Sequence, residues 1–137
     1  MWQLAGATPA LDVNASYAYV LACWQFHRTC RIAQYDDALV GFVTGHWLPD
    51  TPQRLFLWQL AVDAGHRRRG VGRALVDALV EGCRPRYVEA TVTGDNEGSR
   101  RLLHSLAQRH GVPIAEGPGL GTELFPDDHP AEPLVRI

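Results

Sequence analysis

A nearly unbroken apolar run that leads into a basic, glycine-containing turn constrains the fold of this chain most. Leu55–Val62 is apolar apart from Gln59, as expected of a central strand that is covered on both faces. The ten residues 63–72 follow it and hold a cluster of arginines and glycines. An apolar stripe from Val71 to about Glu81 then predicts a helix. A strand that leads through a tight turn into a helix predicts an α/β fold.

Hydrophobic periodicity predicts the other elements. Helices are expected at residues 2–6, at Tyr17–His27 with Asn14 or Ser16 as N-cap, and from about Gly98 to His110 after Asp95-Asn96-Glu97. Strands are expected at Cys30–Tyr35, Ala38–Trp47, Arg86–Thr93, Pro113–Glu116 and Leu134–Ile137, with Leu48–Gln53 as a loop. This order predicts a mixed sheet with helices on its faces, in a single domain over residues 1–137.

Composition excludes several function classes. All 13 basic residues are arginine, so Schiff-base chemistry, a lysine general base and a P-loop are excluded. The net charge of -2 argues against a nucleic-acid binder. Three cysteines without a CxxC pair, and histidines without metal spacing, predict neither a disulfide scaffold nor a metal site. Without an apolar run of about 18 residues, no membrane helix is expected. We therefore expect a cytoplasmic protein.

The turn itself predicts an anion site. In Arg67-x-x-Gly70-x-Gly72 the glycines allow a tight loop and a close approach of the backbone to a ligand. Free N–H groups at the start of the following helix favour an anion. Four arginines, Arg67, Arg68, Arg69 and Arg73, add donors suited to phosphate. The context favours a pyrophosphate over a solvated basic loop, a nucleic-acid patch or a Rossmann site, which lacks its third glycine here.

This motif resembles motif A of the GCN5-related N-acetyltransferases (GNAT), and the order of elements resembles that fold too. The resemblance implies acetyl-CoA as cosubstrate, with its pyrophosphate on the amides of the turn. It also implies that Asn96, the residue expected to cap the next helix, hydrogen-bonds the pantetheine arm, and that a backbone N–H near Leu60–Val62 polarises the thioester carbonyl.

Further segments resemble a narrower family, the L-2,4-diaminobutyric acid acetyltransferases of ectoine biosynthesis. The matching pieces are Leu11-Asp12-x-Asn14-x-Ser16-Tyr17-x-Tyr19, Val40-Gly41-Phe42-Val43, Trp58-Gln59-x-Ala61-Val62-Asp63, Glu89-x-Thr91-Val92-Thr93-x-Asp95-Asn96-x-x-Ser99-Arg100, Leu124-Phe125 and His129-x-x-Glu132-x-Leu134-x-Arg136-Ile137. The resemblance implies acetyl transfer to the γ-amine of L-2,4-diaminobutyrate. The product, N-γ-acetyl-diaminobutyrate, cyclises to ectoine, a compatible solute. It also implies a homodimer, and a GNAT fold that lacks its first strand and most of its first helix.

The same resemblance implies the substrate site. It places Asp12, Tyr17, Trp58 and Glu132 in the substrate pocket, and Tyr17 and Glu132 are the candidate catalytic residues. From the residues alone, Asp12 suits a turn or cap equally well, Trp58 a core, Tyr17 helix packing, and Glu132 a solvated acidic tail. Leu103 stands seven residues after Asn96, where many acetyltransferases of this fold have a tyrosine acid. Tyr17 or water can replace that acid, or none is needed.

Two other functions stay open at this stage. The core motif fits many acceptors, so the chain could acetylate another small amine or amino acid. A non-catalytic CoA-binding module is the third possibility, since a missing first strand would leave a sheet edge open to pairing.

Overall fold

The computed structural model describes residues 1–9 and 11–137, which form two compact units, Met1–Arg86 and Tyr87–Ile137. The first unit contains α1 (Trp2–Gly6), α2 (Ser16–Trp24), β1 (Cys30–Tyr35), β2 (Ala38–Leu48), β3 (Thr51–Val62) and α3 (Val71–Cys83), with short 3-10 turns at His27–Thr29 and Ala64–His66. The second unit contains β4 (Tyr87–Thr91), α4 (Glu97–His110), β5 (Ala115–Leu120), a 3-10 turn at Thr122–Leu124, and β6 (Glu132–Arg136).

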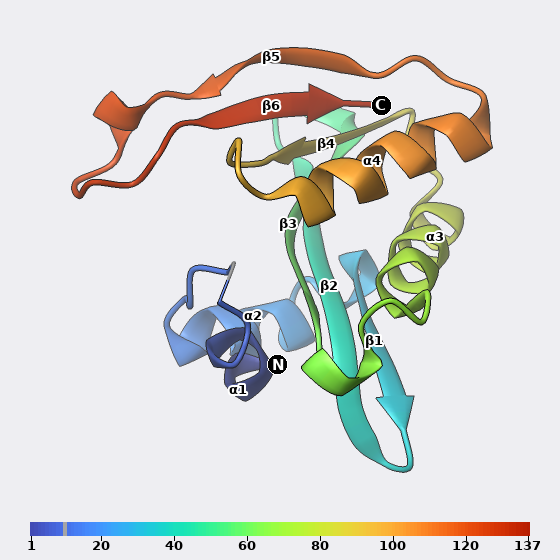
Figure 1. The fold of residues 1–137 in the computed structure, drawn as a ribbon. Coiled ribbons are helices and arrows are strands. Elements are labelled where there is room, and N and C mark those ends of the chain that lie inside the picture. The colour runs from blue at the N-terminus through green and yellow to red at the C-terminus, as the bar shows by residue number, and fades with distance from the viewer. Residues whose placement is uncertain (10) are drawn as a thin grey trace. The chain divides into compact units, whose positions relative to one another are not determined.

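The first unit is an antiparallel sheet of strand order β1-β2-β3 with helices on both faces (Figure 1). Phe42 and Ala61 are cross-strand partners, and the face that they share packs against Ala5 of α1 and Tyr19 of α2. Gly41 points to the opposite face, where a Cβ would lie 3.0 Å from Leu75 of α3. Glycine at position 41 thus lets α3 approach the sheet closely.

A β-bulge interrupts the β2–β3 ladder at Trp58. Thr44 pairs with Gln59 and Gly45 pairs with Leu57, so Trp58 has no residue opposite it. Side chains normally alternate between the two faces of a strand, and one extra residue shifts that alternation. As a result the consecutive side chains of Trp58 and Gln59 both lie on the face that carries α1 and α2.

Several predicted boundaries in the first unit are wrong. The helix predicted to reach His27 ends at Trp24, and a 3-10 turn replaces its last residues. Neither Asn14 nor Ser16 caps it, because Ser16 is already its first helical residue and Ala15 occupies the N-cap position. Most of the loop predicted for Leu48–Gln53 belongs to the β-hairpin, since β3 begins at Thr51. The proline at position 52 lies near the strand start, where a missing N–H is tolerated.

The second unit is an antiparallel ladder of order β4-β6-β5 together with α4. The predicted start of α4 is confirmed, because the Oδ1 of Asn96 accepts a hydrogen bond of 3.1 Å from the N–H of Ser99. Gly111 ends the helix in the left-handed region, at φ 63°. The last two strands exist as predicted, but β5 is two residues later and longer.

No helix within residues 1–9 and 11–137 is both long and apolar enough to cross a bilayer.

Candidate active site

The basic turn has the backbone geometry of a tight loop that opens onto a helix. Arg68 and Gly70 both have positive φ, 58° and 82°. The first helical hydrogen bond of α3 runs from the N–H of Ala74 to the carbonyl of Gly70, at 2.9 Å. The N–H groups at positions 71–73 therefore precede the intrahelical ladder and remain available to an anion.

The glycines of the turn leave room for such an anion. A Cβ on Gly70 would meet no atom within 4 Å, so the space above this residue is open. A Cβ on Gly72 would touch only Leu60 and Val62, at 3.6 Å, which is ordinary contact. The residues of the turn thus fit a pyrophosphate.

The four arginines of the turn have different partners. The Nε of Arg67 donates to the carbonyl of Val62 at 3.0 Å and so ties the loop to the end of β3. Arg73 lies 3.7 Å from Asp77, one helical turn later. Arg68 and Arg69 are exposed. Arg67 therefore has a structural contact that the motif does not predict.

Hydrogen bonds of the Asp63 side chain stabilise the segment that leads into the turn. Oδ2 of Asp63 accepts from the N–H of Gly65 at 3.0 Å and lies 2.9 Å from Nδ1 of His66. The hydrogen bond with His66 is the main reason that the pKa of Asp63 is lowered. The ring of Tyr35 lies 5.4 Å from the His66 ring. These contacts link Asp63, the first residue after β3, to Gly65 and His66.

Three of the predicted substrate residues belong to the first unit. Trp58 is 46% exposed on the bulge of β3, so the alternative of a core tryptophan does not hold. Tyr17 is 66% exposed in the first turn of α2 and does not serve the packing of that helix. Asp12 is exposed in the segment between α1 and α2, and its backbone carbonyl accepts a hydrogen bond of 2.7 Å from Nε2 of Gln59. The bulge therefore places Trp58 and the Asp12 segment on the same face.

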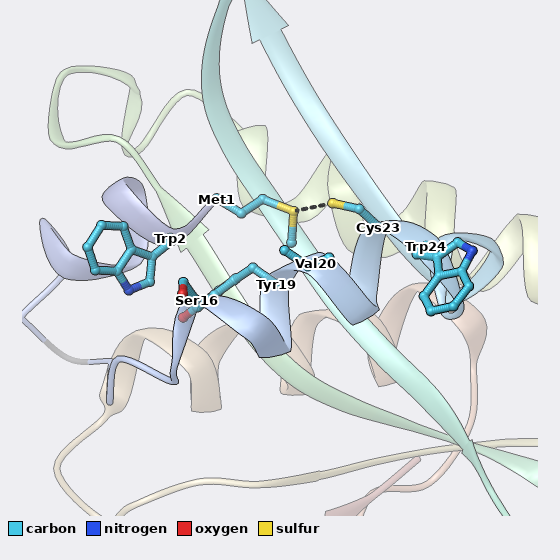
Figure 2. A pocket seen from close by; sticks show the side chains of 7 residues that line it. All are labelled: Met1, Trp2, Ser16, Tyr19, Val20, Cys23 and Trp24. Carbon is cyan, nitrogen blue, oxygen red and sulfur yellow. Dashed lines mark hydrogen bonds between the residues drawn. The ribbon is translucent and has the colours of Figure 1, made fainter.

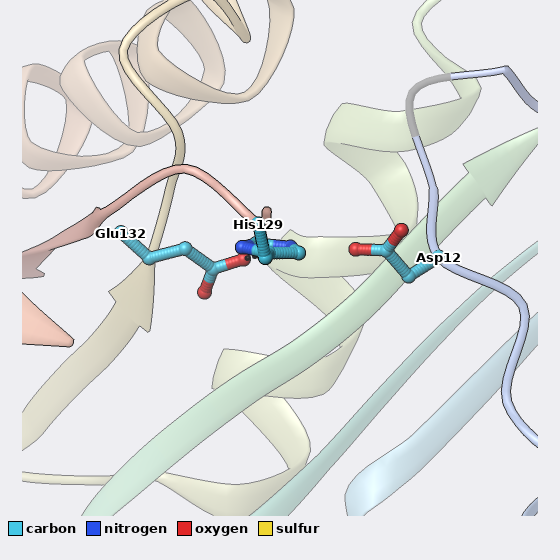
Figure 3. A group of neighbouring side chains, drawn as sticks. All are labelled: Asp12, His129 and Glu132. Carbon is cyan, nitrogen blue, oxygen red and sulfur yellow. Dashed lines mark ion pairs between the residues drawn. The ribbon is translucent and has the colours of Figure 1, made fainter. Parts of the chain in front are cut away.

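Glu132 lies in the second unit, at the first residue of β6. Its Oε2 accepts a hydrogen bond from the hydroxyl of Thr91, and its Oε1 lies 3.7 Å from Nε2 of His129 (Figure 3). The His129 ring stacks on Phe125, with centroids 4.1 Å apart. Only 22% of the Glu132 side chain is exposed, so this carboxylate is held by specific partners and is not part of a solvated acidic tail.

The imidazole of His129 has a defined proton. Its Nδ1 lies 2.7 Å from the carbonyl oxygen of Pro130, and that oxygen can only accept a hydrogen bond. The Nδ1 atom therefore carries the hydrogen, and Nε2 faces the Glu132 carboxylate. With its hydrogen on Nδ1, the ring can donate from Nε2 to the carboxylate only as an imidazolium, and in that state the two groups form an ion pair.

The remaining predicted residues lie in regular structure. Asn96 caps α4, and Leu103 is buried in the same helix. Leu60 and Val62 lie near the end of β3 with half-buried side chains beside Gly72. In the structure, Asn96 thus has a capping role, and the three apolar residues have packing roles.

Burial lowers the pKa of His46 below its usual value. Its ring lies 5.3 Å from the Phe56 ring and 6.4 Å from the Trp58 ring. His46 is therefore a neutral imidazole at neutral pH, and it fixes one edge of Trp58.

The buried His46 predicts a specific pH dependence of stability. Below about pH 6.5 the unfolded chain takes up a proton that the folded chain binds less tightly. The free energy of unfolding should therefore fall as the pH is lowered through that range, and His46→Gln should flatten this part of the curve. Urea unfolding between pH 5 and 8 checks this. An unchanged slope in the variant would assign the effect to other groups.

The cysteines do not offer a nucleophile. Burial raises the pKa of the Cys30 and Cys83 thiols, which keeps them protonated at neutral pH. Cys23 is exposed, and its sulfur lies 3.7 Å from that of Met1.

An open apolar groove of about 520 Å³ lies between α1 and α2 (Figure 2). Its lining residues are Met1, Trp2, Ser16, Tyr19, Val20, Cys23 and Trp24. None of them is a predicted site residue. The groove is therefore a surface separate from the candidate catalytic groups.

Sequence reasoning missed three residues around these groups. Gln59 holds the Asp12 segment, and Thr91 and His129 hold Glu132. All three lie inside motif pieces that the sequence displays. Only the fold, however, shows these contacts. Gln59 and Thr91 contact residues that are 47 and 41 positions away in the chain, and His129 contacts a residue three positions later in a non-helical segment.

Comparisons with known proteins agree with this geometry. The acetyltransferase (GNAT) family model matches residues 2–107. The L-2,4-diaminobutyric acid acetyltransferases of Nocardia farcinica and Shouchella clausii are 38% and 41% identical to this chain; the matches cover all of it and 72% and 79% of those proteins. The structure of the diaminobutyrate acetyltransferase EctA from Paenibacillus lautus, in complex with its substrate L-2,4-diaminobutyric acid and coenzyme A, aligns with a TM-score of 0.94 at 38% identity. That alignment covers 99% of this chain and 85% of the other.

Proposed function

Because the chain belongs to the L-2,4-diaminobutyric acid acetyltransferases of the GNAT family, we propose that it acetylates the γ-amine of L-2,4-diaminobutyrate with acetyl-CoA. The predicted α/β GNAT fold is confirmed by the same comparisons. In the reaction the amine nitrogen forms a bond to the acetyl carbon, the carbon–sulfur bond breaks, and the amine loses a proton. The products are N-γ-acetyl-diaminobutyrate and CoA.

One observation carries this proposal: similarity to enzymes of this single activity extends over the full chain, at 36% to 41% identity. The motif pieces around Asp12, Trp58 and Glu132 all lie within these matches. The geometry agrees, since each of these side chains is at least partly accessible.

Acetyl-CoA supplies the acetyl group as an activated thioester. We assign its pyrophosphate to the turn of Arg67, Arg68, Arg69, Gly70, Gly72 and Arg73, because that turn offers free N–H groups, open space and guanidinium groups. We assign the pantetheine arm to Asn96, and polarisation of the thioester carbonyl to the backbone at Leu60–Val62. A fixed N–H donor of that kind is worth about 3 kcal/mol of transition-state stabilisation.

The substrate chemistry requires two different environments. Only the neutral γ-amine can attack, and an alkyl amine with a pKa near ~10.4 is almost wholly protonated at pH 7. A carboxylate close to that amine would hold it protonated. We therefore assign Asp12 and Glu132 to the α-ammonium group, with Trp58 as an apolar wall. The γ-amine then loses its proton to a base or a water chain, and this division selects γ over α.

Tyr17 and His129 complete the proposed site. Tyr17 carries an accessible hydroxyl that can protonate the leaving thiolate. The buried side chain of Leu103 has no proton to donate for this role. His129, when protonated, would hold Glu132 through an ion pair between Nε2 and the carboxylate.

The two glycines of the turn give a test of the cofactor assignment. Gly72→Ala should keep or raise stability, by up to about 1 kcal/mol, since its φ is ordinary and its Cβ has room. It should nevertheless raise the Kd for CoA about tenfold, because the added methyl keeps the phosphate from an N–H group. Isothermal titration with CoA and thermal unfolding check both parts.

Gly70→Ala is the matched comparison. The left-handed φ of 82° makes this change cost about 1–2 kcal/mol of stability as well as affinity. Wild-type CoA affinity in Gly72→Ala would contradict the pyrophosphate assignment.

We further propose that residues 1–137 act as one N-acetyltransferase domain, because the GNAT match runs across the boundary between the two units. The chain would supply the precursor of ectoine in the cytoplasm and so serve osmoadaptation, without a metal ion and without binding nucleic acid or membrane. Exposed apolar side chains on α1 and α2, including Trp2 and Trp24, support association as a homodimer. Light scattering at several protein concentrations tests this assembly.

An acceptor screen tests the function. Purified protein is incubated with acetyl-CoA and L-2,4-diaminobutyrate, L-ornithine, L-lysine or simple diamines, and thiol release is followed. NMR of the product identifies the acetylated nitrogen. Turnover of diaminobutyrate at the γ position supports the proposal. Turnover of another amine alone would indicate a different small-amine acetyltransferase, and CoA binding without turnover a non-catalytic module.

A further inference from the structure

The side chain of Gln59 is a buried amide in a strand that is otherwise apolar. It is only 8% exposed, and burying an amide is unfavourable unless it is hydrogen-bonded. Its Nε2 donates to the backbone carbonyl of Asp12 at 2.7 Å. This bond joins β3 to a segment 47 positions earlier in the chain.

The β-bulge explains how Gln59 reaches that segment. Without the extra residue at Trp58, strict alternation would turn Gln59 to the face covered by α3. With it, Trp58 and Gln59 point to the same side, beneath the segment that connects α1 and α2. The bulge therefore couples two features: an accessible Trp58 ring and an anchor for the Asp12 backbone.

The segment that carries Asp12 has little regular structure of its own. Residues 12–15 have neither helix nor strand geometry. The buried bond from Gln59 fixes the carbonyl of the same residue whose carboxylate is exposed. A shift of this backbone would displace the carboxylate directly.

We propose that Gln59 is a positioning residue that sets the place of the Asp12 carboxylate for the substrate ammonium. Gln59 itself touches no reacting group. It acts by holding the Asp12 backbone against the bulge of β3. This inference rests on the proposed function, since it needs Asp12 to bind the substrate.

The test is a double-mutant cycle of Gln59→Met and Asp12→Ala in the full chain. Methionine keeps the length of glutamine but cannot donate a hydrogen bond. Gln59→Met should raise the KM for diaminobutyrate about tenfold, because displacing a binding group by about 1 Å costs this much or more. The KM for acetyl-CoA should change less than about twofold, since the pyrophosphate turn is not attached to this segment.

The decisive readout is the coupling between the two changes. If Gln59 acts through the Asp12 carboxylate, Gln59→Met should add almost nothing in the Asp12→Ala background. A purely structural role would instead give additive effects and would raise both KM values. Either of those results would overturn the proposal.

Thr44→Val is the matched control. Thr44 is the cross-strand partner of Gln59 on the same face, and its buried hydroxyl has no hydrogen-bond partner among residues 1–9 and 11–137. Its removal should leave both KM values unchanged. An equal rise of the diaminobutyrate KM in Thr44→Val would attribute the effect to general disturbance of this face.

The same measurements distinguish three ways in which the proposals could fail. If Asp12→Ala raises the KM for diaminobutyrate and Gln59→Met does not, only the positioning role fails. If neither variant changes that KM while diaminobutyrate is still acetylated, the substrate role assigned to Asp12 fails. If diaminobutyrate is not acetylated by the unaltered chain, the proposed function fails.

Discussion

Glu132→Gln is expected to raise the KM for diaminobutyrate by about 10- to 100-fold, which corresponds to the loss of one charge-assisted hydrogen bond. The change keeps the size and shape of the side chain, but it removes the negative charge and replaces one acceptor oxygen with an NH2 donor. If Glu132 binds the α-ammonium, the KM for acetyl-CoA should stay within about twofold of the original value. Steady-state kinetics with each substrate varied in turn measures both constants.

Glu116→Gln is the control for this prediction. Glu116 is a carboxylate of the same unit and lies 2.7 Å from Arg100, on an exposed surface. Its neutralisation removes one negative charge from the second unit without touching Thr91 or His129. Equal effects of the two substitutions would mean that net charge, and not a specific contact, governs binding.

Arg136→Met is expected to lower the free energy of unfolding by about 3 kcal/mol, because it removes the arginine that forms an ion pair with a buried carboxylate. Glu89 and Arg136 are directly opposite in the β4–β6 ladder, and Nε of Arg136 lies 2.5 Å from Oε1 of Glu89. Only 5% of the Glu89 side chain is exposed. Chemical denaturation at neutral pH measures the loss.

The double variant Glu89→Leu, Arg136→Met tests whether the uncompensated charge causes this loss of stability. If the uncompensated charge is responsible, removing both partners should restore most of the lost stability. A double variant as unstable as Arg136→Met alone would show that the aliphatic stem of arginine, and not its charge, is what the fold requires.

The fold could be predicted largely from local patterns. The acetyltransferase turn, the helix that follows it and the cap at Asn96 depend on residues close together in the sequence, and each was found where expected. The errors lie at boundaries that neighbours in space decide. The strand β3 extends back to Thr51 because β2 offers it hydrogen bonds, although two prolines suggest a loop. The end of α2 at Trp24 likewise follows from the 3-10 turn that leads into β1.

The candidate site could be predicted in its residue types but not in its connections. The motif pieces name Asp12, Trp58 and Glu132 through their resemblance to one family. The partners of these residues, Gln59, Thr91 and His129, carry no local sign of their role. The bulge at Trp58 is also invisible in the sequence, since it is a property of the pairing between two strands.

The sequence by itself thus determined the family, the motif of the basic turn and the absence of lysine chemistry, because short-range spacing and composition encode these features directly. The tertiary structure alone decided which face Trp58 and Gln59 share and which groups hold the carboxylates of the site. Those properties depend on strand register and on contacts between residues far apart in the chain. A register shift of one residue would leave every motif intact and turn these side chains to the opposite face.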